Sequence, residues 1–331
     1  MTTETKVMKE TKNKIRVDFE RTSAWERFKL KVFSVSFLGN VVWFLFRFVL
    51  LLGISFVILR PFVTKIASSF MSAEDLVDAT VKLIPKYPTL ERYATYIIGG
   101  SYLKALLDTL ILSLLVALAQ TFICCFIGYG FAKYKFKGVG LLFGLVVLTM
   151  VVPHNAIKFA MHMRFCYFDV FGVIELFTGR AANLLNTFWP FALLSLTGLA
   201  FKNGLYIFMM RQFFRGVPDE LEESAYIDGS GVFRTFFTII LPLSVPMMIT
   251  IFLFAFSWQW TDYFYTGLFF PTGKMVFLSN FTATGSVQAT GAAGSANSAT
   301  ASMLIIAPLI VMYLFCQRYL IQGIERSGIV G

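Results

Sequence analysis

Charged side chains are scarce in this chain, where they make up 15% of the 331 residues. A soluble globular protein carries about 25%. Hydrophobic residues reach 57% and aromatic residues 17%. Several apolar runs have a length of about 20 residues, which is what an α-helix needs to cross a hydrocarbon core. Because only helices and closed barrels satisfy every backbone polar group in lipid, these runs predict an all-α integral membrane protein.

Histidine and cysteine are also few, and the patterns that mark common enzymes are missing. His154 and His162 are the two histidines, and no HExxH or paired CxxC spacing accompanies them. The four cysteines are Cys124, Cys125, Cys166 and Cys316. Three of them lie in or beside apolar runs, which favours buried thiols over disulfides. No GxxxxGKS/T run is present to hold a nucleotide. The sequence therefore predicts a chain that is not an enzyme and binds no metal or other cofactor of its own.

Basic residues outnumber acidic ones by 29 to 19, for a net charge of +10. The cations flank apolar runs, so anionic lipid headgroups and the positive-inside rule explain them better than nucleic acid does. The basic segment 1–39 precedes the first apolar run and is expected in the cytoplasm. A membrane-surface helix within Arg16–Phe37 and a flexible tail over Met1–Lys14 both fit its composition. No cleavable signal pattern is found.

The apolar runs predict a membrane domain over 40–322, with six transmembrane helices and both termini in the cytoplasm. The expected spans are about 41–63, 105–131, 139–156, 187–210, 240–262 and 300–319. Cations return the chain to the cytoplasm after the second span, at Lys133, Lys135 and Lys137. A loop over about 217–241 and a tail over 323–331 complete the expected cytoplasmic side.

A polar, acidic stretch between the fourth and fifth spans carries strong helix signals. Pro218 suits the first position of a helix, and the carboxylates after it favour the positive end of the helix dipole. These carboxylates are Asp219, Glu220, Glu222 and Glu223. Gly229 supplies the stop, because a residue without Cβ adopts the left-handed conformation at little cost. A second helical run, Val232–Leu241, is expected to end at Pro242.

The spacing of this stretch resembles a known motif. The triplet Glu223–Ala225 is followed by Gly229 after three residues and by Ile239–Pro242 after nine more. This is similar to the EAA loop of the inner-membrane permeases of ABC importers; Ser224, in place of the middle alanine, keeps the side chain small. The resemblance implies a coupling helix that docks into a cleft on a separate ATPase subunit. It assigns this coupling to Pro218, Glu222, Glu223, Ser224, Ala225, Asp228, Gly229, Leu241 and Pro242. An amphipathic connector between two membrane helices is the alternative.

Three other segments resemble the same family. Tyr87–Tyr93 is similar to its PTLENY segment, and Gly130–Gly138 to its AYALARFRFRG turn. Gln317–Gly323 resembles the QRYFVQG ending of the maltose-type sugar permeases. Together these segments indicate similarity to the smaller permease of a carbohydrate importer, from about Val41 to the C-terminus. The tail Glu325–Gly331 departs from the family's TAGAVKG.

The resemblance implies a type I ABC importer permease in the cytoplasmic membrane of a prokaryote, working by alternating access. The implied partners are a second homologous permease, two ATPase subunits that hold ATP and magnesium, and an extracytoplasmic binding protein that delivers a sugar or oligosaccharide. A permease for amino acids, polyamines or phosphonates is the alternative, and the QRY ending argues against it. An ion-coupled carrier would show inverted repeats or acids at mid-span, which this sequence lacks. A membrane-embedded hydrolase would need a catalytic set that is also missing.

Two ionisable residues fall in the expected spans, where such groups are costly and therefore often functional. Lys202 lies in the fourth span and either faces a translocation cavity or snorkels toward the inner leaflet. Asp262 ends the fifth span, where an outer-interface position is the alternative to a place in the pathway. On continuous helices the two residues would be roughly 20 Å apart, too far for a salt bridge. Trp258, Gln259 and Trp260 offer stacking faces and an amide to a sugar, and are candidates for its path.

Overall fold

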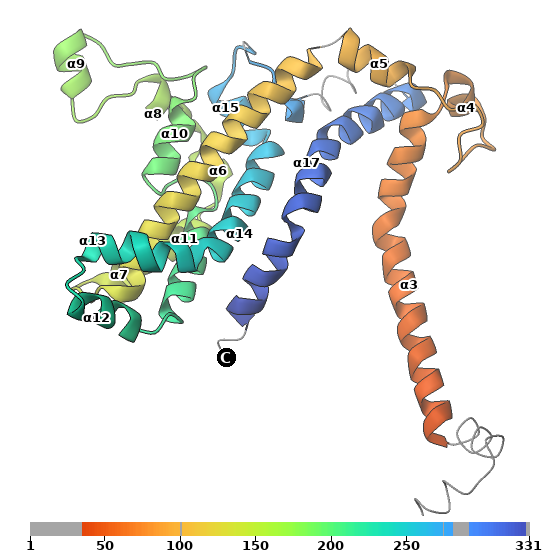
Figure 1. Ribbon diagram of the computed structural model, residues 1–331. Helices are drawn as coiled ribbons and strands as arrows, with labels where there is room; N and C mark the ends of the chain where they lie inside the picture. Colours follow the sequence, from red (N-terminus) through yellow and green to blue (C-terminus); the bar gives the residue numbers. More distant parts are fainter. Residues whose placement is uncertain (1–34, 100, 274, 281–290, 329–331) are drawn as a thin grey trace, which may run out of the picture. The chain divides into compact units, whose positions relative to one another are not determined.

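The computed structural model describes residues 35–99, 101–273, 275–280 and 291–328. Its helices, labelled in Figure 1, are α3 (Val35–Phe70), α4 (Ala73–Val77), α5 (Glu91–Ile98), α6 (Tyr102–Lys133), α7 (Val139–Val151), α8 (His154–Cys166), α9 (Val173–Thr178), α10 (Trp189–Leu196), α11 (Asn203–Arg215), α12 (Glu220–Ile227), α13 (Val232–Thr235), the π-helical η1 (Phe236–Ile240), α14 (Leu241–Trp260), α15 (Phe264–Phe269) and α17 (Gly291–Gly328). Within these ranges the strand-like pairings are two isolated bridges. The expected all-helical fold is confirmed there. Most of the basic segment predicted over 1–39 lies outside the described residues.

The chain divides into two compact units, residues 1–64 and 65–331. The described part of the first unit belongs to α3, which is apolar on every side. Its stretch Gly39–Phe70 is long and apolar enough to cross a membrane. A helix that is apolar all round is suited to lipid.

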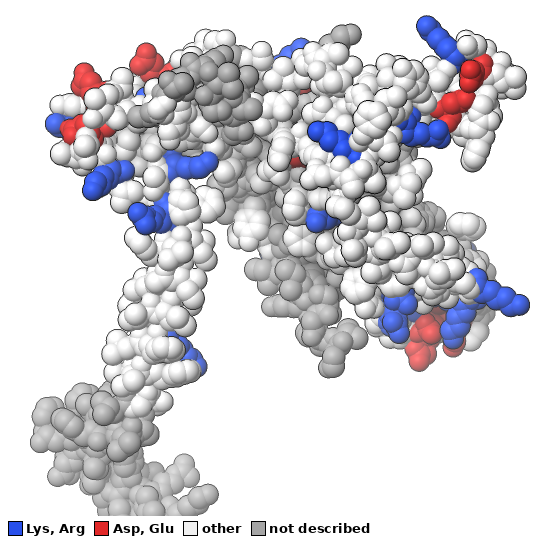
Figure 2. Space-filling model, turned by 180° about the vertical axis from the view of Figure 1, so that it is seen from behind, with Lys and Arg blue, Asp and Glu red and all other residues white. Residues whose placement is uncertain are grey.

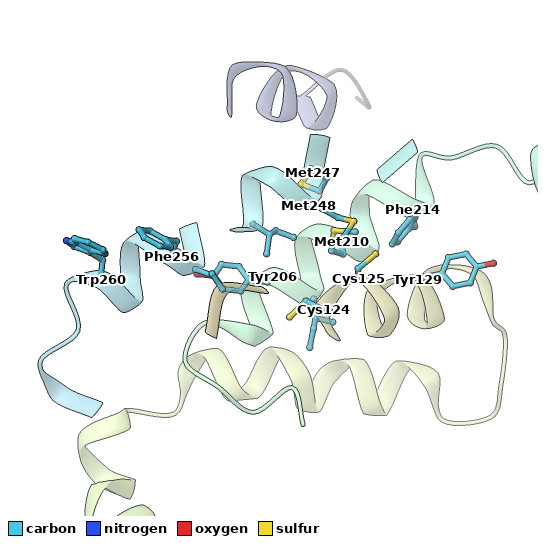
Figure 3. Packing of buried hydrophobic residues seen from close by; sticks show 14 of the residues in the cluster. Cys124, Cys125, Tyr129, Tyr206, Met210, Phe214, Met247, Met248, Phe256 and Trp260 are labelled. Atoms are coloured by element: carbon cyan, nitrogen blue, oxygen red, sulfur yellow. The ribbon is translucent and has the colours of Figure 1, made fainter. Parts of the chain in front are cut away.

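The core of the second unit forms where α6 packs against α11 and α14 (Figure 3). The side chains labelled in the figure are Cys124, Cys125 and Tyr129 of α6, Tyr206, Met210 and Phe214 of α11, and Met247, Met248, Phe256 and Trp260 of α14. Two of these helices bury about half of their most apolar stretch. The buried share is 44% for α6 and 50% for the run Val232–Trp260, which contains α14. The exposed stripes remain for lipid or for a second membrane chain.

Gly128 lets α6 and α11 approach closely. A Cβ at this position would lie 2.5 Å from the Cβ of Met210 and 3.0 Å from the backbone nitrogen of Arg211. Further along the same contact, the Sγ of Cys124 lies 3.8 Å from the backbone oxygen of Asn203. The small residues of α6 therefore set the distance between these two helices.

Four described helices are long and apolar enough to cross a membrane: α3, α6, the run from Val232 to Trp260, and α17. A further candidate is the pair α7 and α8, which bend by 101° where they meet. Pro153 has no N–H to continue the helix, and it holds Val152 in an extended conformation. The third span was expected over 139–156, but its helix ends at Val151.

The single helix expected over 187–210 is divided in two. Between α10 and α11 the backbone turns at Gly198, with φ 74°, and at Lys202, with φ 67°. Lys202 stands at the N-terminal cap of α11. The prediction that Lys202 lies within a continuous helix was therefore wrong. The residues around the break are as apolar as those of a continuous helix, so hydropathy did not indicate it.

The helical run that begins at Val232 was expected to end at Pro242. In the structure it continues through Pro242 to Trp260. A π-helical turn, Phe236–Ile240, lies between α13 and α14, and the N–H of Leu241 bonds to the oxygen of Phe236. The wider turn accommodates a proline that would otherwise crowd the carbonyl four residues before it. Pro242 thus marks a change of helix type instead of a helix end.

The second unit has two polar ends. In Figure 1, α12 and α13 lie with the C-terminal end of α6, whereas α8, α9 and α15 lie toward the opposite end. On the face in Figure 2, charged side chains gather at both ends and leave a mostly uncharged band between them. Such a band suits the hydrocarbon core of a bilayer.

Substitution of Gly128 tests the contact between α6 and α11. We expect Gly128→Ala to destabilise the protein by about 1–3 kcal/mol, because the new methyl group meets backbone atoms that cannot yield freely. Gly130, two residues on in the same helix, has nothing within 4 Å of an added Cβ. Gly130→Ala should therefore leave the unfolding temperature of the detergent-purified protein unchanged or raise it, since alanine favours helix. Equal unfolding temperatures for the two variants would contradict the close approach.

Candidate functional site

The predicted surface helix is present as α12, Glu220–Ile227, with three acidic residues in its first turn. It ends in a Schellman motif. Gly229 has φ 82°, its N–H bonds to the oxygen of Tyr226 at 3.0 Å, and the N–H of Ser230 bonds to the oxygen of Ala225 at 2.9 Å. The predicted helix and its glycine stop are confirmed, and the bend directs the chain into α13. Pro218 was expected at the first helical position, but the oxygen of Asp219 accepts the first helical bonds, so α12 begins at Glu220.

The inward face of α12 is joined to α6 by polar contacts. Glu222 is 8% exposed, and the hydroxyl of Tyr129 donates to its Oε2 at 3.0 Å. The Nζ of Lys133 lies 3.6 Å from Glu222 Oε1, within ion-pair reach, and donates to Asp219 Oδ1 at 2.5 Å. It also donates to the backbone oxygen of Val217 at 2.7 Å. We call Tyr129, Lys133, Asp219 and Glu222 the Lys133 clamp.

Lys133 lowers the pKa of Asp219, the exposed carboxyl of this clamp. Its hydrogen bond, and then its charge, hold the pKa of the Asp219 carboxyl below the ordinary value. The resulting stabilisation is present above the ordinary pKa of aspartate and disappears as the pH falls through the lowered one. Because Asp219 is exposed to solvent, this contribution is screened and small, and Glu222 provides the buried contact.

The outward face of α12 is exposed to solvent. Glu223 and Ser224 are exposed, and the hydroxyl of Ser224 donates to the oxygen of Glu220 at 2.7 Å. Ile227 is 87% exposed, and Phe233 of α13 is 80% exposed. We call Glu220, Glu223, Ser224, Ile227 and Phe233 the docking face. Acidic and apolar side chains stand together on it, as on a surface that binds another protein.

The residues assigned to ATPase coupling thus divide between two faces. Pro218, Glu223, Ser224, Asp228, Gly229 and Pro242 are exposed. Glu222 and Ala225 are buried against this chain's own helices, and Leu241 is half-buried. Ala225 was expected to pack on the ATPase, but in this structure it faces inward. The sequence marked Lys133 only as a topology signal and gave no sign of Tyr129, because both contacts join segments far apart in the chain.

A second candidate region lies at the two helix breaks. A cavity of about 520 Å³ opens between the bend of α7 with α8 and the break between α10 and α11. We call it the break cavity; its lining includes Pro153, His154, Ile157, Phe201, Lys202 and Tyr265. His154 Nδ1 and the hydroxyl of Tyr265 are hydrogen-bonded across it. The Nζ of Lys202 lies 4.7 Å from the ring centroid of Phe201 and 4.8 Å from that of Trp258.

An adjoining pocket holds three of the residues proposed for the sugar path, Trp258, Gln259 and Asp262. Trp258 is 48% exposed, and the Nε2 of Gln259 is buried without a hydrogen-bond partner. The Asp262 carboxylate accepts the N–H groups of Tyr265 and Thr266, at 3.2 and 2.9 Å. Asp262 therefore begins α15 by binding its free N–H groups.

Trp260 has a different environment from its neighbours. It is 2% exposed, and its Nε1 donates to the backbone oxygen of Ile305 at 2.9 Å. Its ring stacks on Phe256 at 5.3 Å. The structure gives Trp260 a packing contact between α14 and α17 instead of a place on a cavity wall.

Lys202 and Asp262 come to the same region, which the sequence did not predict. The Lys202 ammonium contacts Trp258, and Asp262 lines the adjoining pocket with Trp258. The separation expected for continuous helices therefore does not apply. No ion pair joins the two among the described residues, and the Asp262 carboxylate accepts two backbone N–H groups. No cluster of three or more His, Cys, Asp or Glu side chains suited to a metal ion occurs in the same part of the chain.

Helix packing, the surface helix and the polar ends define a helical membrane protein, and comparison with known proteins gives its family. The family described as the binding-protein-dependent transport system inner membrane component matches residues 124–326. Because this is more than half of the chain, the protein belongs to that family. It is a multi-pass permease of the cytoplasmic membrane.

Individual proteins resemble the chain over most of its length. It is 26% identical over 292 residues to the galactooligosaccharides transport system permease protein GanQ of Bacillus subtilis (strain 168), covering 87% of this chain and 95% of GanQ. It is 26% identical over 294 residues to the polygalacturonan/rhamnogalacturonan transport system permease protein YtcP of the same strain, covering 85% and 96%. A solved chain from a bacterial ABC transporter involved in the import of the acidic polysaccharide alginate has the same fold, with a TM-score of 0.67 at 18% identity, covering 87% of this chain and 98% of that one.

Loss of the Lys133 ammonium tests the clamp. Lys133→Met leaves Glu222 buried without its counter-charge, and we expect a loss of about 3 kcal/mol of folding stability. Lys133→Met combined with Glu222→Gln should recover most of this loss, since no unpaired charge then remains. The matched control is Lys137→Met, which removes an exposed cation of the same loop. Thermal unfolding of the purified protein measures all three, and a double variant no more stable than Lys133→Met would contradict the ion pair.

Proposed function

We propose that this chain is the permease through which an ATP-driven importer carries a sugar or oligosaccharide into the cell. The observation that carries this proposal is α12, which is fixed to the permease by one face and leaves the other free for a partner. The family match and the named sugar permeases among its relatives support the substrate class. The relatives are named for both neutral and acidic sugar polymers, so their names alone do not choose the charge of the sugar.

Six membrane crossings are the topology that we propose, with both termini in the cytoplasm. Four crossings are α3, α6, the run Val232–Trp260, and α17. The bent pair of α7 and α8 would supply a fifth, and the divided α10 and α11 a sixth. The uncharged band between the two polar ends supports this arrangement (Figure 2). The cations of Lys133, Lys135 and Lys137 at the α12 end favour the cytoplasm there.

The proposed partners follow from what the chain lacks and exposes. One of two ATPase subunits would receive the docking face, and the pair would supply the ATP and magnesium sites. A second homologous permease would cover part of the exposed apolar surface of the membrane helices. An extracytoplasmic binding protein would deliver the sugar at the opposite end.

Alternating access would be driven from α12. Closure of the ATPases on ATP would move this helix, and the Lys133 clamp would pass the movement directly to α6, the most extensively packed helix of the second unit. The break cavity lies along α7 and α11, and α11 packs on α6 through Gly128. A displacement at the docking face would therefore reach the cavity through two helix contacts.

Three variants of the coupling segment test the ATPase contact. Glu223→Lys reverses a charge on the docking face, and we expect it to weaken ATPase binding by about 2 kcal/mol or more, about thirtyfold. Gly229→Val should act similarly, since a β-branched residue resists the positive φ found there. Ser224→Ala is the control: its hydroxyl bonds only to the oxygen of Glu220 within its own helix.

The measurements are co-purification of the ATPase and sugar-stimulated ATP hydrolysis by the assembled importer. Normal assembly and coupled hydrolysis in both Glu223→Lys and Gly229→Val would show α12 to be a mere connector, and would remove the main support for the function. The chain purified alone should hydrolyse no ATP, because no phosphate-binding loop is present in the sequence. ATP turnover by the isolated chain would contradict the assignment of the nucleotide to partner subunits.

A further inference from the structure

We propose that the break cavity binds the carboxylate of an acidic sugar during its passage, so that this chain favours uronate-containing substrates over neutral ones. This inference rests on the proposed function, because it takes the cavity to be part of the sugar path. It adds the charge of the substrate, which the comparisons leave open.

The first argument is the cavity's place in the fold. Helix breaks at membrane depth are tolerated where they line a polar cavity, because free backbone groups then find partners. Two helices of 13 residues each begin at this cavity: α8 at His154, and α11 directly after its N-terminal cap Lys202. The first N–H groups of a helix lack acceptors within it and carry partial positive charge. Two such ends at one cavity favour an anion over a neutral ligand.

The second argument is charge. Lys202 is the only Lys, Arg, Asp or Glu in the cavity lining. Its ammonium lies over the rings of Phe201 and Trp258, and no ion pair or hydrogen bond from it occurs among the described residues. Lys202 is half-buried, and its ammonium is left without an anionic partner inside this chain. No ion pair joins Lys202 to Asp262 among the described residues, and the Asp262 carboxylate binds the N–H groups that begin α15.

The third argument concerns the rest of the ligand. The cavity volume of about 520 Å³ lies in the range of about 300–1,000 Å³ typical of small-molecule sites. Phe201, Trp258 and Tyr265 supply aromatic faces around the cation, and a sugar ring offers C–H groups to stack on such faces. Gln259, in the adjoining pocket, holds a buried amide nitrogen without a partner. Cation, rings and amide together match a ring that bears a carboxylate and hydroxyl groups.

The test uses the importer assembled with its partner subunits in nanodiscs of neutral phosphatidylcholine. Binding of trigalacturonate is compared with that of galactotriose, the neutral trisaccharide of similar size, by saturation-transfer NMR titration. We expect the wild-type importer to bind trigalacturonate about tenfold more tightly, since only the carboxylate forms a charge-assisted hydrogen bond with Lys202. Lys202→Met should abolish this preference and Lys202→Arg should keep it.

Several outcomes would overturn the proposal: equal binding of the two sugars, binding of neither, or a preference that survives in Lys202→Met. A further arm adds anionic phosphatidylglycerol to the nanodiscs. Displacement of trigalacturonate by this lipid in the wild type but not in Lys202→Met would assign the cavity to lipid headgroups and also overturn it. Co-purification of the ATPase with Lys202→Met distinguishes failure of this inference from failure of the proposed importer function. The importer function requires assembly with the ATPase and ATP hydrolysis whatever the sugar's charge.

Discussion

The structure depends on how one buried carboxylate is held. Both ion pairs found in the described residues use Lys133, and the one to Glu222 is shielded from solvent. Without that cation, the buried carboxylate would keep the hydrogen bond from Tyr129 but would have no counter-charge. With Lys133 in place, the short surface helix α12 is fixed to the membrane helix α6. The free face of α12 keeps one orientation toward whatever binds it.

A second constraint shapes the interior. Backbone groups in hydrocarbon must be paired, yet two of the membrane segments are broken, at Pro153 and between Gly198 and Lys202. The breaks face each other across one cavity, whose lining includes a cation, a hydrogen-bonded histidine and aromatic rings. Polar groups that would be unfavourable singly in a bilayer are thus collected in one place. The clamp and the cavity are joined through α6 and α11, whose close contact at Gly128 leaves little freedom for independent movement.

The sequence predicted what depends on local residues and missed what depends on distant ones. Acidic residues after Pro218, followed by Gly229, are enough to place α12 and its end. Hydropathy located the apolar segments but not the break before Lys202, because the residues around it are as apolar as those of a continuous helix. That one error carried over to the expected distance between Lys202 and Asp262. The inward position of Ala225 also required knowledge of which helix lies beside α12.

The π-helical turn before Pro242 also sets the direction in which the side chains of α13 point relative to those of α14. A turn closed by five residues instead of four inserts one residue into the helical ladder, which rotates everything beyond it by about 100°. The outward direction of Phe233 and the inward direction of Ile240 are therefore set relative to each other by the count of residues between them. Insertion or deletion of a single residue in Phe236–Ile240 would turn the docking face around the axis of α14. The length of this segment is as strictly specified as its residues.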